Sequence, residues 1–233
     1  MNNKTLAITS FNKNIYESYA FRFIESFDGI DLKVYSEDSF QVKTEKLYLH
    51  EEFVKRNSHI VTDDFKFDAV RFCFKPYTIA QAINEFGADY TRLLWLDADT
   101  IFFKPITEAW VDKNLHTKPA LLSYLGRPNW HSETGVLLFE TNHKYTKEYI
   151  ERVIHYYDSD EIFKEKEWHD SYIWDLVRKQ YPKKYFNNLG VSYRVPGGHI
   201  QAHLFGDSFD HTKGSERKAK GYSIENLRRP IKK

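Results

Sequence analysis

The sequence has little cysteine, no long apolar run and almost no net charge. Cys73 is the single cysteine among 233 residues, which excludes an internal disulfide and favours a reducing compartment. Residues 1–8 lack the apolar core of a signal peptide, and no later run reaches the length needed to cross a bilayer. We therefore expect a soluble, cytoplasmic protein with no membrane span.

The balance of charge also limits the partners. Lysine and arginine number 34 and aspartate and glutamate 33, so the net charge of +1 gives no overall field that would attract nucleic acid or a membrane. Residues 213–233 nevertheless hold eight basic and two acidic residues, which concentrates positive charge at that end. With 41% hydrophobic residues the chain is long enough to bury a full core, and we expect one α/β domain over residues 1–233.

The most informative stretch runs from residue 92 to residue 103, where two carboxylates interrupt an apolar run. Residues 93–96 are typical of a buried strand, and residues 101–103 of a second short one. Asp97 and Asp99 are separated by one residue, so in extended backbone both side chains can point to the same side and share a divalent cation. The alternative is a strand-ending turn in which the aspartates accept backbone hydrogen bonds.

The first 36 residues predict the β-α-β opening of a nucleotide-binding sheet. Residues 5–10 are typical of a strand, residues 15–27 of a helix with one apolar face, and residues 32–36 of a second strand. A nucleotide would lie at the loop after the first strand, so Thr9, Ser10 and Phe11 are candidate contacts to it. An ordinary surface loop with a helix cap explains the same residues equally well.

Further along, the pattern predicts a helix over residues 67–86 that ends at Gly87 and is kinked or broken near Pro76. Arg71 and Lys75, four residues apart, should share one face of it. Residues 37–65 show little pattern apart from a possible strand at 46–49. The other expected elements are strands over residues 119–124 and 135–139 joined by a polar loop over 126–134, and helices over 145–157 and from about residue 168.

The run Leu94-Trp95-Leu96-Asp97-Ala98-Asp99-Thr100 resembles the DxD motif of nucleotide-sugar glycosyltransferases of the GT-A fold. The resemblance implies a single α/β domain with a central mixed, mostly parallel sheet flanked by helices. It also implies that the motif, Ala98 included, lies against the donor and that the two acids hold Mn²⁺, or Mg²⁺, on the donor's diphosphate.

A second element resembles family 8 of these enzymes. The spacing His211-x-x-Gly214-x-x-Arg217 is similar to a His-x-x-Gly-x-x-Lys element in which the histidine is the third metal ligand and the basic residue holds the diphosphate. Here Arg217 replaces the lysine, Lys218 stands beside it, and the Pro-Trp that often follows is missing. His203 begins a similar spacing but has Phe209 where a base is wanted, so His211 is the better candidate.

The resemblance also assigns roles to residues whose ordinary explanation is structural. Basic residues on the helix before the DxD strand would reach the donor phosphates, although exposed cations are commoner. Acidic residues near the sugar would contact the sugar and the acceptor, although a role as helix N-cap would also explain Asp170. The residues are Arg71 and Lys75 for the phosphates, Glu133, Thr134 and Asp170 for the sugar and acceptor, and Trp130 as a stacking or core residue.

Together these features predict a metal-dependent glycosyltransferase that moves a sugar from a nucleotide-diphosphate donor, taken as a UDP-sugar, to a hydroxyl of a glycan, protein or small molecule. Asp170 would be the general base if the enzyme inverts and would stabilise positive charge at the anomeric carbon if it retains. Residues 213–233 would fold over the donor as a lid. The alternatives are a metal-dependent phosphodiesterase or nuclease and a carbohydrate-binding module without catalysis.

Overall fold

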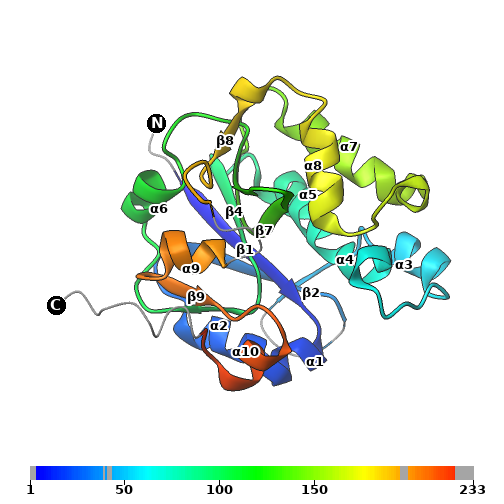
Figure 1. The fold of residues 1–233 in the computed structure, drawn as a ribbon, viewed down its shortest axis with the longest axis horizontal. Coiled ribbons are helices and arrows are strands. Elements are labelled where there is room, and N and C mark those ends of the chain that lie inside the picture. Colours follow the sequence, from blue (N-terminus) through cyan, green and yellow to red (C-terminus); the bar gives the residue numbers. More distant parts are fainter. Residues whose placement is uncertain (1–3, 39, 41–43, 195–198, 224–233) are drawn as a thin grey trace.

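A mixed sheet forms the centre of the computed structural model, which describes residues 4–38, 40, 44–194 and 199–223 (Figure 1). Its seven strands lie in the order β3-β2-β1-β4-β7-β6-β8, with β7 antiparallel to both neighbours and the other pairs parallel. A separate two-stranded ribbon pairs β5 with β9. The strands are β1 Thr5–Phe11, β2 Asp31–Ser36, β3 Glu45–Lys46, β4 Arg92–Leu96, β5 Thr100–Phe102, β6 Leu122–Arg127, β7 Trp130–Glu140, β8 Phe186–Asn188 and β9 Phe209–His211.

Helices cover both faces of the sheet (Figure 1). The set α3, α4, α5, α7 and α8 lies on one side and the set α2, α6 and α9 on the other, with α10 beside η1. Their bounds are α1 Lys13–Ile15, η1 Tyr16–Ala20 (a π-helical turn), α2 Phe21–Ser26, α3 Glu51–Asn57, η2 Phe65–Phe67, α4 Ala69–Phe72, α5 Phe74–Phe86, α6 Glu108–Asn114, α7 Thr146–Asp158, η3 Glu161–Lys164, α8 Asp170–Arg178, η4 Lys183–Tyr185, α9 Ile200–Phe205 and α10 Ser215–Lys220.

The two faces explain why the central strands are apolar at every position. Along β4, Leu93 and Trp95 pack into one core with α5, α7 and α8, while Leu94 and Leu96 pack into the other with α2, α6 and α9. Successive side chains of a strand point to opposite faces, so a strand that is covered on both sides needs no polar alternation. The predicted mixed, mostly parallel sheet flanked by helices is confirmed.

Three predicted elements differ from the structure. The first strand continues through Phe11, so the expected nucleotide loop is strand backbone at its start. The helix predicted over residues 67–86 is broken at Cys73, before Pro76, because α5 begins there with the proline in its first turn, where no backbone donor is lost. Residues 126–134, predicted as a loop, form a β6–β7 hairpin that turns at Asn129, whose φ is 60°.

Smaller differences concern the chain ends of elements. The possible strand at 46–49 is limited to β3. Helix α5 ends with Gly87 as its C-cap, as predicted, although this glycine keeps a right-handed φ of −63°. Residues 224–233, part of the expected lid, lie outside the described residues.

The edge of the sheet opposite the candidate metal ligands is closed by a buried arginine. The guanidinium of Arg92 is fully buried and pairs with Asp112 and with Glu108, whose Oε2 lies 2.8 Å from Nη2. Glu108 also accepts hydrogen bonds from the backbone and hydroxyl of Thr5. These bonds tie the starts of β1 and β4 to α6.

We expect Arg92→Met to lower the free energy of unfolding by about 2 kcal/mol, because the fully buried guanidinium and its charge-assisted hydrogen bonds to Glu108 and Asp112 are lost, while these acids are 36% and 50% exposed. Arg56→Met is the matched control, since Arg56 and its partner Asp160 are both about 40% exposed and such pairs contribute under about 1 kcal/mol. Urea unfolding of the two variants measures the difference. If both variants lose the same stability, the buried Arg92 does not stabilise the fold more than an exposed ion pair does.

Candidate active site at the end of β4

The acids of the motif lie where β4 leaves the sheet. Asp97 donates its backbone N–H to the carbonyl of Gly135 on β7, and its own carbonyl accepts from the N–H of Thr100, which turns the chain into β5. The carboxylate of Asp97 accepts from the indole Nε1 of Trp95 at 2.8 Å. Asp99 is 8% exposed, so both acids are held at the edge of the core.

The ribbon of β5 and β9 brings a histidine to these acids. Thr100 pairs with His211 in register, which places the imidazole beside the turn. Its Nε2 lies 2.9 Å from Oδ1 of Asp99 and 3.7 Å from Oδ2 of Asp97. The three candidate ligand atoms all lie within 4.8 Å of one another. Of the two candidate histidines, His211 is therefore the one beside the acids. His203 is exposed on α9 with its ring against that of Tyr193.

Two lysines face the acids from opposite sides. Lys75 on α5 lies 2.9 Å from Oδ1 of Asp97, and Lys218 on α10 lies 3.1 Å from Oδ2 of Asp99. Burial alone would raise the pKa of Asp99, but the His211 imidazole and then the Lys218 ammonium outweigh it and hold that pKa far below its usual range. Burial opposes the charge of Lys218 as well, yet Asp99 and Tyr19 keep the pKa of its ammonium raised.

Lys75 connects the motif to the start of α8. Its ammonium lies 2.9 Å from Oδ2 of Asp170 and also donates to the carbonyl and hydroxyl of Thr134 on β7. Burial would raise the pKa of Asp170, but the Lys75 ammonium and the Thr134 hydroxyl lower it overall, so this buried carboxylate is ionised. Asp170 is the first helical residue, and the N-cap is the side chain of His169, so capping does not explain the aspartate.

Glu133 closes the other side of the site. It is 5% exposed and accepts from Lys213 at 2.7 Å, with Nη1 of Arg127 at 3.4 Å. Burial would raise its pKa, but Lys213, His211 and Arg127 together hold that pKa well below the usual range. Lys213 had no assigned role in the sequence, because its partner lies 80 residues away.

Two further residues were not found from the sequence. Gly135 touches the site so closely that a Cβ there would meet Gln201 Nε2 at 2.3 Å and Oδ2 of Asp97 at 3.1 Å. Gln201 on α9 lies 2.8 Å from Nδ1 of His211, and its own Oε1 is buried without a hydrogen-bond partner among the described residues. The glycine was recognised only as part of a strand pattern, and the glutamine carries no sequence signal.

The arrangement fits a hard divalent cation. Two carboxylates and one imidazole nitrogen are a suitable donor set for Mn²⁺ or Mg²⁺. A metal-binding Nε2 requires a proton on Nδ1 of His211, and half a turn of the Gln201 amide would place its unpartnered Oε1 as the acceptor of that proton. Asp97, Asp99 and His211 are therefore the residues that would hold the ion.

The candidate nucleoside contacts lie at the end of β1. Phe11 is fully buried and packs in a small cluster that Ala98 also contacts, with its ring 5.7 Å from the ring of Tyr16. Ser10 donates to Glu37 at 2.8 Å. Thr9 is fully buried, and its hydroxyl has no partner among the described residues. These three residues lie at the end of the strand beside β4, which leads into Asp97 and Asp99. Their role in binding a nucleotide stays a prediction.

Several predicted residues are not brought to the acids. Arg71 is exposed on α4 with its guanidinium over the ring of Phe72. It lies on another helix than Lys75, because α4 ends at Phe72. Arg217 donates to the carbonyl of Lys213, so it is its neighbour Lys218 that reaches Asp99. Gly214 has a φ of +90° at the start of α10, and Trp130 is 57% exposed on the hairpin.

A second cluster, of His131, Glu167 and His169, lies directly before α8. The Nε2 atoms of the two histidines lie 3.2 and 2.7 Å from Oε2 of Glu167. Nδ1 of His169 accepts the backbone N–H of Tyr172, so the neutral ring carries its proton on Nε2 and donates it to Glu167. This cluster is a hydrogen-bonded support for the start of α8, and hence for Asp170.

Comparison with known proteins identifies the fold. No family model matches the chain, and no curated protein matches it in sequence. A glycosyltransferase involved in the glycosylation of the major capsid of PBCV-1 superposes with a TM-score of 0.53 over 94% of this chain and 98% of its own, at 17% identity. The chain therefore has the α/β fold of that glycosyltransferase, and the predicted GT-A-like architecture is confirmed.

Looser superpositions are found with mouse xyloside xylosyltransferase 1 and with GlyE from Streptococcus pneumoniae TIGR4. The first has a TM-score of 0.48 and 10% identity over 79% of this chain and 84% of its own. The second has a TM-score of 0.43 and 16% identity over 82% of this chain, which spans only 46% of GlyE.

Among the described residues, no helix is both long and apolar enough to cross a membrane.

We expect the pair of Ser10 and Glu37 to make stability depend on pH. Burial raises the pKa of Glu37 to about 7 although Ser10 donates to it, so the native state binds more protons than the unfolded state at mildly acidic pH. Stability therefore falls as the pH rises through this range. The free energy of unfolding of Glu37→Gln should be higher than that of the parent by about 2 kcal/mol at pH 8 and almost the same at pH 5.

Urea unfolding at the two pH values measures this difference. The control is Glu52→Gln, at an exposed position on α3, which should change the free energy of unfolding by the same small amount at both pH values. A gain for Glu37→Gln that is the same at pH 5 and pH 8 would rule out the burial of an ionised Glu37 as its cause.

Proposed function

We propose that this protein is a metal-dependent glycosyltransferase that transfers a sugar from a nucleoside diphosphate donor, first of all a UDP-sugar, to an acceptor hydroxyl. The observation that carries the proposal is the convergence of Asp97, Asp99 and His211 between two partly buried lysines, on the fold of a glycosyltransferase. The two resemblances in the sequence, the DxD motif for Asp97 and Asp99 and the His-x-x-Gly-x-x-Lys element for His211, imply the same three ligands.

Charge explains why lysines belong beside these acids. A divalent ion held by Asp97 and Asp99 would neutralise both carboxylates and supply charge stabilisation to a diphosphate. Lys218 and Lys75, which face the acids without it, would then be free to hold phosphate oxygens of the leaving group. Positive groups placed where charge develops contribute about 3 kcal/mol each to such a step. Arg217, next to Lys218 on α10, is within the same segment.

Asp170 is the best candidate for the group beside the reacting carbon. It is buried, ionised and fixed by Lys75 and Thr134, both of which hold its Oδ2. In an inverting reaction it would accept the proton of the acceptor hydroxyl, and in a retaining reaction it would stabilise positive charge at the anomeric carbon. Glu133, held by Lys213 and Arg127, would bind sugar hydroxyls.

The other two functions are less well supported. A phosphodiesterase or nuclease with two metals needs more carboxylates than the two that this cluster offers among the described residues. A binding module without catalysis would have no use for three convergent ligands and two partly buried lysines. The site therefore favours transfer chemistry over both.

We expect Asp99→Asn to abolish the stabilisation of the protein by Mn²⁺ and to reduce the manganese-dependent hydrolysis of UDP-sugars at least about a hundredfold. The reason is the loss of one of three ligands and of the charge that attracts the ion. Thermal shift with Mn²⁺ and release of UDP are the two measurements. Asp63→Asn, at an exposed position away from the site, should change neither. If Asp99→Asn retains both properties, the metal assignment is wrong.

Lys218 and Lys220 offer a second comparison within one helix. Lys218→Gln should weaken UDP binding in the presence of Mn²⁺ about tenfold or more and slow donor hydrolysis similarly, because it removes a phosphate partner. Lys220 pairs with Glu216 on the exposed side of α10, so Lys220→Gln should leave both values unchanged. Calorimetry and UDP release measure the effects, and equal effects of the two variants would remove Lys218 from the proposed donor site.

A further inference from the structure

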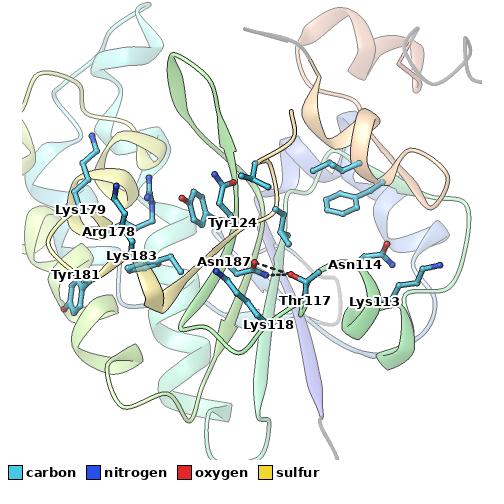
Figure 2. Close-up of a pocket in the computed structure, with 16 residues that line it drawn as sticks. Lys113, Asn114, Thr117, Lys118, Tyr124, Arg178, Lys179, Tyr181, Lys183 and Asn187 are labelled. Carbon is cyan, nitrogen blue, oxygen red and sulfur yellow. Dashed lines mark hydrogen bonds between the residues drawn. The ribbon is translucent and has the colours of Figure 1, made fainter. Parts of the chain in front are cut away.

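A cavity lies away from the candidate metal site, along the edge strand β8 (Figure 2). Its volume is about 860 Å³. One bank carries Lys113 and Lys118, at and after the end of α6, and the opposite bank carries Lys179 and Lys183, between α8 and β8. Tyr124 and Asn187 lie between the banks in Figure 2. We call this cavity the basic groove.

The groove is positively charged without compensation. Arg178 also lines it, but this side chain pairs with Asp175 at 2.9 Å and lies over the ring of Tyr124. The four lysines have no acidic partner among the described residues, and no aspartate or glutamate lines the groove. In a chain whose net charge is only +1, four unpaired cations around one cavity indicate an anionic ligand.

The rings of the groove argue against nucleic acid. Tyr124 and Phe186 are 8% and 5% exposed, the first is covered by Arg178, and Arg152 lies over the ring of Tyr181. A base therefore finds no open ring face to stack on, which single-stranded nucleic acid binding requires. Hydrogen-bond donors are available, since Nδ2 of Asn188 has no partner among the described residues while its Oδ1 is used by Gly126. Such a surface suits the hydroxyls and acidic groups of a sugar chain.

The groove leads towards the candidate active site. A second cavity of about 290 Å³ shares Tyr124, Arg178 and Asn188 with it and extends to Arg127 on the β6–β7 hairpin. Arg127 in turn contacts Glu133, the acid that closes the sugar side of the site. A chain lying in the groove would therefore continue over the hairpin to the place where the sugar is transferred.

We propose that the basic groove binds an acidic glycan, one that bears carboxylates or phosphates, and that this glycan is the acceptor; the second part rests on the proposed glycosyltransferase function. The lysines of both banks neutralise the acidic groups, Nδ2 of Asn188 donates to a hydroxyl, and Leu189, Val191 and Leu204, which also line the groove, contact the apolar faces of the sugar rings. The end of the glycan then reaches Glu133 and Asp170.

The binding test uses no donor and no metal. Calorimetry at about 50 mM salt compares oligogalacturonate, phosphorylated dextran, plain dextran and single-stranded oligothymidylate. We expect one of the two acidic glycans to bind and dextran not to. Lys113→Gln/Lys118→Gln and Lys179→Gln/Lys183→Gln should each weaken binding about tenfold. The control Lys55→Gln/Lys164→Gln, at exposed positions outside the groove, should change it less than twofold.

Which acidic glycan binds distinguishes carboxylate from phosphate as the recognised group. Absence of a preference over dextran, equal losses in the control, or equally tight binding of oligothymidylate would each overturn the proposal.

The transfer test separates this proposal from the function of the site. Donor hydrolysis should be unchanged in the groove variants, because their lysines lie away from the metal ligands, whereas the KM for the acidic glycan in transfer should rise about tenfold at unchanged kcat. If the parent protein binds the glycan but hydrolyses no donor, the proposed function fails and the groove stands as a binding site. If donor hydrolysis occurs and the glycan does not bind, only the groove proposal fails.

Discussion

Two carboxylates at the edge of a buried sheet need positive charge beside them, and the structure is arranged to supply it. Asp97 and Asp99 end a strand that is covered on both faces, where an ionised acid is costly unless a cation meets it. Lys75 comes from a helix that precedes the strand, while His211 and Lys218 come from more than 100 residues later. In the proposed function the same side chains would have new partners, with His211 as a metal ligand and the two lysines holding a diphosphate.

The elements around the acids are tied to this arrangement. The pairing of the short strands β5 and β9 holds His211 at the turn after β4. The start of α8 is fixed by the cluster of His169 and Glu167, which orients Asp170 towards Lys75. Rigid strands and helix ends thus position the charged groups, which suits a site that must hold a transition state in one geometry.

The charge pattern of the surface continues that of the site. The acids lie at the end of β4, whereas unpaired lysines line the edge strand on the far side of the β6–β7 hairpin. A neutral protein can hold both because the charges are segregated, and the segregation decides which ligand goes where. In the proposed function the nucleotide and metal would bind at the buried acids, and in the proposed groove an acidic acceptor would bind at the exposed lysines.

The sequence by itself determined the α/β class, the buried strand before the acids and the candidate ligand set, because these depend on local patterns such as an apolar run and the spacing of two aspartates. It predicted a kink or break near Pro76 but not its place at Cys73, between Arg71 and Lys75, and so it placed these two residues on one helical face. The hairpin at residues 126–134 was also hidden, since its polar residues look like a loop until the strands pair.

Only the tertiary structure decided which distant side chains meet. It placed Lys218 rather than Arg217 at Asp99, and it brought Lys213 to Glu133 across 80 residues. Gln201 joined the site in the same way, with no motif to mark it. Such contacts are set by the packing of whole elements, because the energy that fixes them comes from cores far from the site, and no local spacing in the chain encodes them.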